Sequence, residues 1–361
     1  MRITGQKLWV AGIAVFAAGI GAAMAGAGVA SAQAQPQLRS VYVAGALPVT
    51  DPTSASWAQA APVNVALTPQ IVTVPMLLKG TIPSLEVRSL NNGDWIAFRL
   101  EWEDSSLDGT AITQDKFRDA AAIQLPVDPS IPGVCMGVRG QPVNLWHWKA
   151  DWQTDIDAGF QDLTNAYPNF WKDYYPFAVG KPPFVVPQDF ADADARRYLV
   201  GWAVGNPLSQ PARVTPIEEL VAHGFGTAAS QSSQSVLGRG QWQNGRWSVV
   251  FARPMTTSGP DEAQFTPGGK GFVAVAAWNG SNQEVGGRKQ ISADLALTVA
   301  APPAPAQQVS QAPIPAPAEP SFVKRYWWAG AVVLAALLVA GAAVLGDLYG
   351  RLSAAERKVT E

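Results

Sequence analysis

The sequence predicts an all-β body, a β-sandwich with one short helix, followed by a single transmembrane helix. The 361 residues include 14 Trp, 29 Pro and 33 Gly, a composition that favours strands and turns over long helices. Short apolar runs separated by turn residues recur along the chain, as is typical of sandwiches. With 48% hydrophobic and 15% charged residues, the chain can bury a sizeable core.

The clearest strand signals come from two hairpins and two single strands. Residues 84–102 form two runs around an Asn-Asn-Gly-Asp turn, and the second run alternates apolar with polar residues, so one face should be buried. A second hairpin over 241–251 turns at an Asn-Gly pair. Residues 117–125 and 271–278 are expected to be further strands.

Residues 215–222 carry the one strong helix signal in the body. Thr215 can act as N-cap with Pro216 at the first helical position, and two glutamates follow in the first turn. Gly224 would end the helix directly after His223. Residues 153–200, rich in aromatic residues, Asp and Pro, are interpreted as an insertion that forms a covering loop, a lid or a partner surface.

The N-terminus has the pattern of a secretory signal. Residues 1–32 contain Arg2 and Lys7, then an apolar run over 8–30, and end in small residues suited to cleavage. The alternative is an uncleaved anchor, because the apolar run is long.

The remaining chain divides into a body over 37–299, a Pro- and Ala-rich linker over 300–321, a transmembrane helix over 326–346 and a cytoplasmic tail over 347–361. Three aromatic residues open the apolar segment, as expected at a membrane interface. Basic residues flank it on both sides, so the signal decides the orientation. The body should therefore be extracytoplasmic and held by a single-pass anchor.

Composition and motifs exclude several functions. A net charge of −2 gives no basic footprint for nucleic acid. With one cysteine the chain has no CxxCH motif for covalent haem, and Cys135 is expected to be a small buried thiol. No HExxH, phosphate-binding loop or dinucleotide fingerprint occurs. Nothing indicates that the chain is itself an enzyme.

The stretch over 117–152 contains a candidate cofactor ligand. It is predicted to form strand, loop and strand, with Met136 at the bend and Trp146 and Trp148 as aromatic walls. Haem iron accepts Met as an axial ligand. The ordinary alternative is that Met136 fills a gap in the core.

Several blocks, in this order and spacing, resemble the haem b-binding gamma or C subunits of periplasmic molybdenum enzymes of the dimethyl-sulfoxide-reductase class, such as ethylbenzene dehydrogenase. They cover roughly residues 40–300 and are DAAAIQLP (119–126), CMG (135–137), PVNLWHWKADW (142–152), GNPLS (205–209), TPIEELVAHGFGT (215–227), GQWQNGRWSVVFARP (240–254) and VAVAAWNGSNQEVGGRKQIS (273–292).

The resemblance implies an immunoglobulin-like or carbohydrate-binding-module-like sandwich that holds one non-covalent haem b between a Met and, commonly, a Lys. Met136 matches the family's Met. The partners implied are an iron–sulfur subunit and a molybdopterin catalytic subunit, together with the membrane.

The second axial ligand is where this sequence departs from the family as we align it. Residues 205–227, where the family's Lys is expected, contain none. His223 and Lys149 are the competing candidates, while Lys289, a water molecule or no haem remain open. Gly224 and Phe225 would lie beside the macrocycle.

Three functional hypotheses follow. The first is a membrane-anchored b-type cytochrome that passes electrons between an iron–sulfur and molybdenum enzyme and an extracytoplasmic or membrane carrier. The second is a haem-free sandwich that binds carbohydrate or protein. The third is a stand-alone respiratory cytochrome b without a molybdenum partner.

Overall fold

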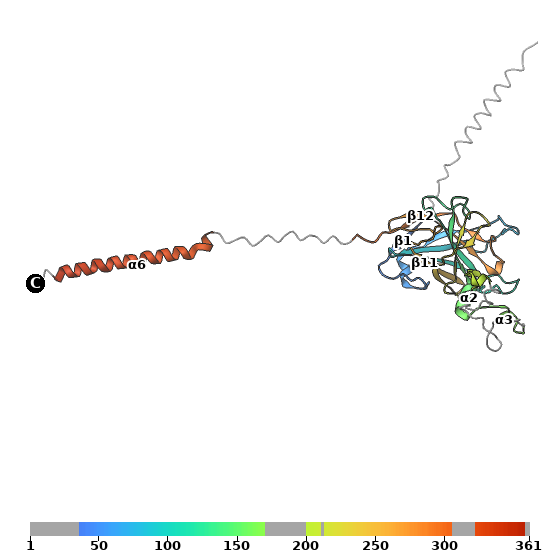
Figure 1. The fold of residues 1–361 in the computed structure, drawn as a ribbon, viewed down its shortest axis with the longest axis horizontal. Helices are drawn as coiled ribbons and strands as arrows, with labels where there is room; N and C mark the ends of the chain where they lie inside the picture. Colours follow the sequence, from blue (N-terminus) through green and yellow to red (C-terminus); the bar gives the residue numbers. More distant parts are fainter. Residues whose placement is uncertain (1–35, 170–199, 211–212, 305–321, 358–361) are drawn as a thin grey trace, which may run out of the picture. The chain divides into compact units, whose positions relative to one another are not determined.

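A computed structural model describes residues 36–169, 200–210, 213–304 and 322–357 (Figure 1). The chain divides into two compact units, and the boundary along the chain falls between Pro302 and Pro303. The first contains the all-β body, which confirms the predicted fold class. The second contains the C-terminal helix α6.

The body's strands, in chain order, are β1 (Gln37–Tyr42), β2 (Val63–Ala66), β3 (Thr68–Pro69), β4 (Ser84–Asn91), β5 (Trp95–Glu103), β6 (Ala120–Pro126), β7 (Val143–Lys149), β8 (Ile217–Ala222), β9 (Ala229–Ser230), β10 (Leu237–Gln243), β11 (Arg246–Pro254), β12 (Lys270–Trp278), β13 (Gln290–Ile291) and β14 (Leu295–Val299). The short helices are η1 (Ala55–Gln59), α2 (Ala150–Ala158), α3 (Leu163–Ala166), α5 (Val200–Ala203), η2 (Pro207–Ser209) and η3 (Gly280–Asn282).

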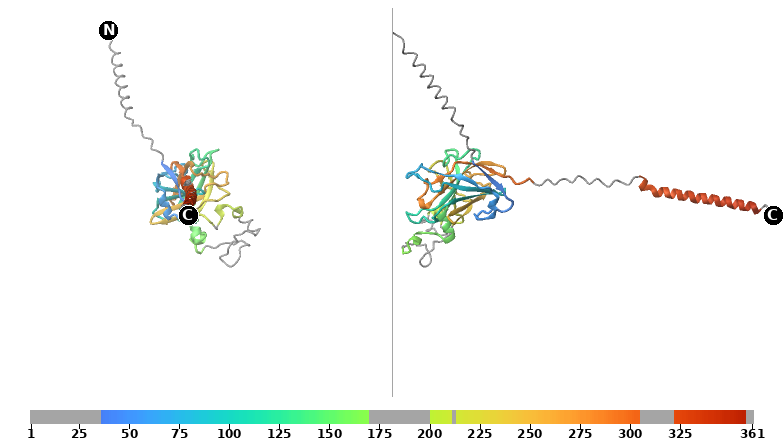
Figure 2. Two further views of the ribbon diagram at one scale, coloured as in Figure 1. Left: turned by 90° about the vertical axis from the view of Figure 1, so that its left-hand side faces the viewer. Right: turned by 180° about the vertical axis from the view of Figure 1, so that it is seen from behind.

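Strand β12 joins the two layers of the sandwich. Its first half, from Lys270 to Val273, pairs with β14, and its second half, from Ala274 to Trp278, pairs with β6. The strand order is β10-β11-β5-β4-β1-β14-β12-β6-β7-β8-β9. The first layer therefore runs from β10 to β14 and the second from β12 to β9, while α2 and α3 lie at one end of the body (Figures 1 and 2).

Aromatic side chains from both layers fill the space between them. Phe98 of β5 meets Trp146 of β7 edge to face, with ring centroids 5.8 Å apart. Trp148 of β7 meets Trp247 of β11 in the same way at 4.7 Å. Such pairs add to the large apolar area that each ring buries, so β7 is fixed firmly against the first layer.

Both predicted hairpins are present, as β4–β5 and β10–β11. The turn of the second hairpin has Asn244 at φ 53° and Gly245 at φ 75°. Asn and Gly tolerate this left-handed conformation, which two-residue hairpin turns of this kind require.

The predicted helix over 215–222 is wrong, because this segment forms β8. It pairs with β7 along its length, and Glu218 pairs with Lys149 while Glu219 pairs with Arg253. The capping pattern is a local signal, and these buried cross-strand ion pairs override it. The body's longest helix is instead α2, among the described residues. Of the predicted insertion, residues 170–199 lie outside the described part.

Helix α6 (Phe322–Arg357) contains Tyr326–Ser353, the one span in the described residues long and apolar enough to cross a membrane, with a mean hydropathy of 2.4. This agrees in position with the predicted transmembrane segment.

A buried polar network links β7, β8 and β11 inside the sandwich. The Arg253 guanidinium donates to the carboxylate of Glu219 at 2.6 Å and to Asn144 Oδ1 at 2.9 Å, and all three residues are 0% exposed. Asn144 Oδ1 also accepts the indole N–H of Trp146. Each charge therefore depends on its partner, since neither reaches water.

We predict that Glu219→Ala lowers the free energy of unfolding by about 3–5 kcal/mol, because it leaves Arg253 charged, buried and unpaired. Urea unfolding measures the change. Glu103→Ala is the control, because Glu103 pairs with Arg246 at the surface and its loss should cost at most about 1 kcal/mol. Equal effects of the two variants would contradict the prediction.

Candidate cofactor site

A pocket of about 620 Å³ lies on the outer face of the second layer. Its floor consists of side chains from neighbouring strands: Ala122 and Gln124 of β6, Leu145 and His147 of β7, Leu220 of β8, Ala274, Ala276 and Trp278 of β12, and Ile291 of β13. Ala122 pairs with Ala276 on one side and with His147 on the other. Because alanine carries only a methyl group, the middle of the floor is low and leaves room for a flat ligand.

Loops between the strands form the walls. The loop between β6 and β7 contributes Cys135 and Met136, and the loop after β8 contributes Phe225. Residues 69–72 and 286–294 close the other side. The pocket is mainly apolar and its size is ordinary for a small-molecule site.

Met136 is held at the tip of a tight turn. Cys135 has φ 49° and Gly137 has φ 79°, and Gly137 donates its N–H to Val134 O at 2.8 Å. The carbonyl of Met136 accepts the N–H of Gly224 at 3.0 Å, which ties this turn to the loop after β8. The thioether therefore enters the pocket from a fixed backbone.

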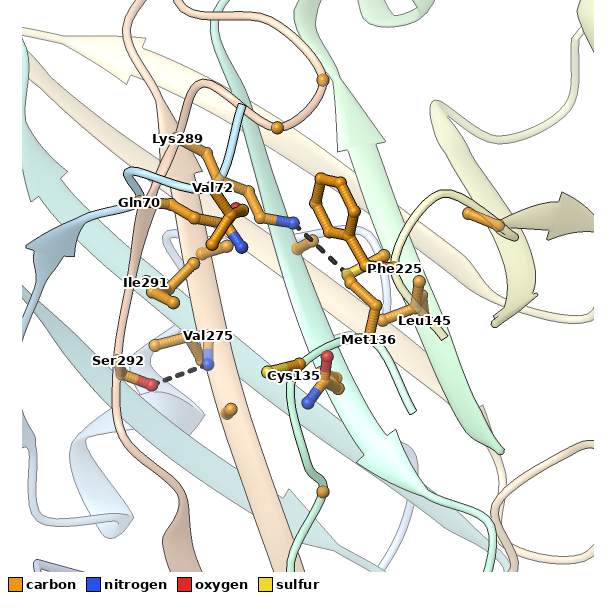
Figure 3. A pocket seen from close by; sticks show the side chains of 18 of the residues that line it. Gln70, Val72, Cys135, Met136, Leu145, Phe225, Val275, Lys289, Ile291 and Ser292 are labelled. Carbon is orange, nitrogen blue, oxygen red and sulfur yellow. Dashed lines mark hydrogen bonds between the residues drawn. The ribbon is translucent and has the colours of Figure 1, made fainter. Parts of the chain in front are cut away.

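Lys289 faces Met136 across the pocket, and its Nζ lies 3.5 Å from Met136 Sδ (Figure 3). Lys289 is 8% exposed, and it forms no ion pair with a carboxylate among the described residues. Its Nζ lies 5.2 Å from the centroid of the Trp278 ring. Burial lowers the pKa of Lys289 to about 8, so the neutral amine, which can donate a lone pair, is unusually accessible.

Three buried polar atoms in this pocket have no hydrogen-bond partner within the described chain: Gln70 Oε1, His147 Nε2 and Asp294 Oδ1. Buried polar groups are nearly always paired, so these three atoms are free to bond to water or to a polar group of a ligand. Burial also raises the pKa of Asp294.

The structure does not bring Lys149 to this pocket. Its ammonium forms a buried ion pair with the carboxylate of Glu218 and lies 3.9 Å from the centroid of the Trp152 ring. Burial lowers the pKa of Lys149 to about 8, partly against the attraction of Glu218. The ammonium of Lys149 is therefore paired with Glu218, whereas Lys289 has no carboxylate partner among the described residues.

The segment over 223–226, which includes residues expected beside the cofactor, reaches the pocket only in part. Phe225 and Gly226 line it, but His223 is exposed and is not among the lining residues. With β8 in place of the expected helix, His223 begins a turn in which its N–H donates to Thr227 Oγ1 at 2.9 Å. Gly224 contributes its backbone bond to Met136 and not a pocket wall.

Trp146 and Trp148 point away from the pocket. Alternate side chains of a strand project to opposite faces, and these two lie in the core between the layers, whereas Leu145 and His147 face the pocket. Cys135, expected to be buried, is exposed instead, because it lies in the Met136 loop and not in a strand.

Sequence reasoning named Lys289 only among the open alternatives and gave His147 no role, although the fold makes both prominent in the pocket. Lys289 lies far from Met136 along the chain, and the pairing of β13 with β12 brings it near. The one available signal was its place in the block over 273–292, which also contains part of β12, a strand that lines the floor.

Comparison with known proteins identifies the family. Residues 54–290 match the ethylbenzene dehydrogenase family. This is more than half of the chain, so the protein belongs to that family, which confirms the predicted resemblance.

Two relatives are more specific in name. A respiratory nitrate reductase heme subunit from Haloferax mediterranei is 25% identical over 242 residues, which cover 67% of this chain and 65% of that protein. The chain thus matches just under two thirds of this relative's length. Chlorate reductase subunit gamma from Ideonella dechloratans is 23% identical over 292 residues, which cover 80% of this chain and 94% of the relative.

Solved structures of a family 9 carbohydrate binding module from Caldicellulosiruptor kristjanssonii are also similar. The complex with cellotriose has a TM-score of 0.36 at 6% identity and covers 75% of this chain and 96% of that one. The complex with glucose has a TM-score of 0.33 at 5% identity, with coverages of 75% and 99%.

We predict that Gly137→Ala destabilises the protein more than Gly140→Ala. Both glycines have positive φ, so both variants suffer the left-handed penalty of about 1–2 kcal/mol. Only at Gly137 would the new Cβ meet a backbone atom, Ala222 O at 2.5 Å, while at Gly140 nothing lies within 4 Å. Overpacking should add about 1–3 kcal/mol to the loss in unfolding free energy. Equal losses in urea unfolding would show that the turn adapts.

A second prediction concerns the stability of the haem-free protein. Lys289 has its pKa lowered from 10.5 to about 8, so the folded state is penalised wherever the lysine is charged. At about 1.36 kcal/mol per pKa unit, Lys289→Met should stabilise the fold on the order of 3 kcal/mol at pH 7.

This gain should shrink as the pH rises from about 8 toward 10.5, because the unfolded chain then also loses the proton. Urea unfolding at pH 7 and pH 10 checks both points. Lys270→Met is the control. Lys270 lies exposed at the start of β12, so its replacement should change the unfolding free energy little. A destabilised Lys289→Met protein at pH 7 would disprove the argument.

Proposed function

We propose that the pocket binds one haem b without a covalent link, with Met136 and Lys289 as the two axial ligands. The observation that carries the proposal is the approach of Lys289 Nζ to Met136 Sδ across the pocket (Figure 3). A thioether and a neutral amine are both lone-pair donors for iron. At 3.5 Å the two atoms are in contact, so the side chains would have to move apart to admit the iron, and they come from separate loops.

Three further observations support this cofactor. The pocket is large and mainly apolar, and its alanine floor suits a flat ring. One relative is named a heme subunit. The single cysteine, Cys135, belongs to no CxxCH motif, so haem would be held without thioether links to the chain.

Lys289 replaces His223 and Lys149 as our candidate for the second ligand. His223 is exposed and outside the pocket lining, and Lys149 is bonded to Glu218. Lys289 is buried, lacks a carboxylate partner among the described residues and points at Met136. Its lowered pKa reduces the cost of losing the proton that ligation requires.

With this cofactor the protein would be an electron-transfer subunit and not itself a catalyst. A bound haem supplies reversible one-electron oxidation and reduction of its iron, and an axial Met tends to raise the reduction potential. The chain's own part is to hold the donors and to keep the ring in an apolar pocket. The partners we propose are the iron–sulfur and molybdopterin subunits of a reductase complex.

The proposed location is based on two apolar segments of the chain. We propose that residues 1–32 direct export and that the segment over 326–346 anchors the protein, with residues 347–361 in the cytoplasm. The body over 37–299 then lies on the extracytoplasmic side, at the end of the linker over 300–321. There it would exchange electrons with an extracytoplasmic or membrane carrier.

We predict that the full-length protein in detergent binds haem with reducible Soret and α bands and a low-spin spectrum. Met136→Leu keeps the side-chain volume and Lys289→Leu keeps a side chain of similar size, and each removes a donor because leucine has no lone pair to give. Each variant should therefore become high-spin or lose haem. Met136→His should retain haem at a lower potential, because imidazole donates more strongly than thioether.

Two controls test the assignment. His223→Ala and the paired variant Lys149→Met with Glu218→Gln, which removes both charges together, should leave the spectrum unchanged. A wild-type spectrum from Met136→Leu or Lys289→Leu would refute the ligand assignment. A purified wild-type protein that takes up no haem would refute the function and favour the haem-free binding module.

A further inference from the structure

His147 lies where the main pocket meets a second one. It lines the main pocket and also a neighbouring pocket of about 200 Å³, and the two share His147, Trp278 and Gly286. The second pocket is lined in addition by Lys116 and Arg118. Basic side chains therefore lie on the far side of His147 from the main pocket, with Arg118 paired to Asp151.

The imidazole is fixed and has a free polar atom. Its ring stacks on Trp278 with centroids 4.8 Å apart and an interplanar angle of 28°. Its Nε2 is buried and has no hydrogen-bond partner among the described residues. Burial holds the pKa of His147 well below its usual value, so the ring is neutral and carries one N–H to donate.

The two ends of the main pocket differ in charge. Basic side chains gather near His147: the charges of Lys149 and Arg118 lower its pKa further, and Lys116 lines the second pocket beside it. At the Gln124 end the pocket is lined by Asp294, whose Oδ1 lies 3.7 Å from the position a Cβ would take on Gly133. An anionic group would thus be favoured at the His147 end and repelled at the Asp294 end.

We propose that His147 orients the cofactor by donating a hydrogen bond from Nε2 to one of its carboxylates, so that the carboxylate edge of the ring faces Trp278 and the basic second pocket. This inference depends on the proposed function, since it concerns haem in the same pocket. His147 is a positioning residue and not an axial ligand. Glu284, which also lines the second pocket, does not compete for the donor, because its carboxylate accepts from Asn279 N, Asn282 and Gln290.

The test compares haem b with its dimethyl ester, in which both carboxylates are blocked, by spectroscopic titration of the full-length protein in detergent. His147→Phe keeps the ring stack on Trp278 but removes the donor. It should weaken haem b binding about 10- to 100-fold, the range expected for a hydrogen bond to a charged group. Affinity for the dimethyl ester should not change.

His147→Gln offers an amide N–H near the same position and should retain most of the affinity for haem b. At saturating haem both variants should keep the low-spin spectrum of the wild type. The inference is overturned if His147→Phe weakens both ligands equally or neither, or if it gives a high-spin spectrum.

Failure of the proposed function has a different signature. A wild-type protein that binds neither haem b nor its ester would overturn that function, and this inference with it. Binding of both ligands by every variant with equal affinity would leave the haem pocket standing and overturn only the role of His147.

Discussion

Strand β7 is buried on both faces, and the arrangement of the site depends on this constraint. Its inner face places Trp146 and Trp148 against the aromatic side chains of β5 and β11. Its outer face places Leu145 and His147 on the floor of the pocket. The packing of the core therefore sets the position of the floor, because the side chains of one strand cannot shift on one face without shifting on the other.

The loops between the strands form the walls of the pocket and supply its candidate ligands. The Met136 turn and the segment before β13 come from opposite sides of the same floor, and each is tied to a strand pair by backbone bonds. The rim is apolar as well: Ile71, Val72 and Phe225 are all more than half exposed. A subunit that exchanges electrons with partner proteins has use for such a rim, since exposed apolar patches mark contact surfaces.

The sequence was sufficient for the sandwich, the two hairpins, the family and the Met136 loop, because each has a strong local or ordered signal. The Asn-Gly turn at Asn244, for example, requires only its own backbone conformation. The helix over 215–222 failed since its capping residues compete with ion pairs to strands that are distant in sequence. Assigning Trp146 to the pocket failed for a related reason: both faces of β7 are buried, so alternation alone could not say which one is the core.

The proposed role of Lys289 could not be predicted from local sequence either, because it depends on Met136, which is 153 residues away in the chain. Its buried amine also has a consequence for assembly. A lysine ligand must give up its proton when metal binds, so with the proposed ligands the maturation of this protein would release a proton for each cofactor inserted. An acidic surrounding would then oppose insertion and favour the empty form, and an exported protein would acquire its cofactor most readily where the compartment is least acidic.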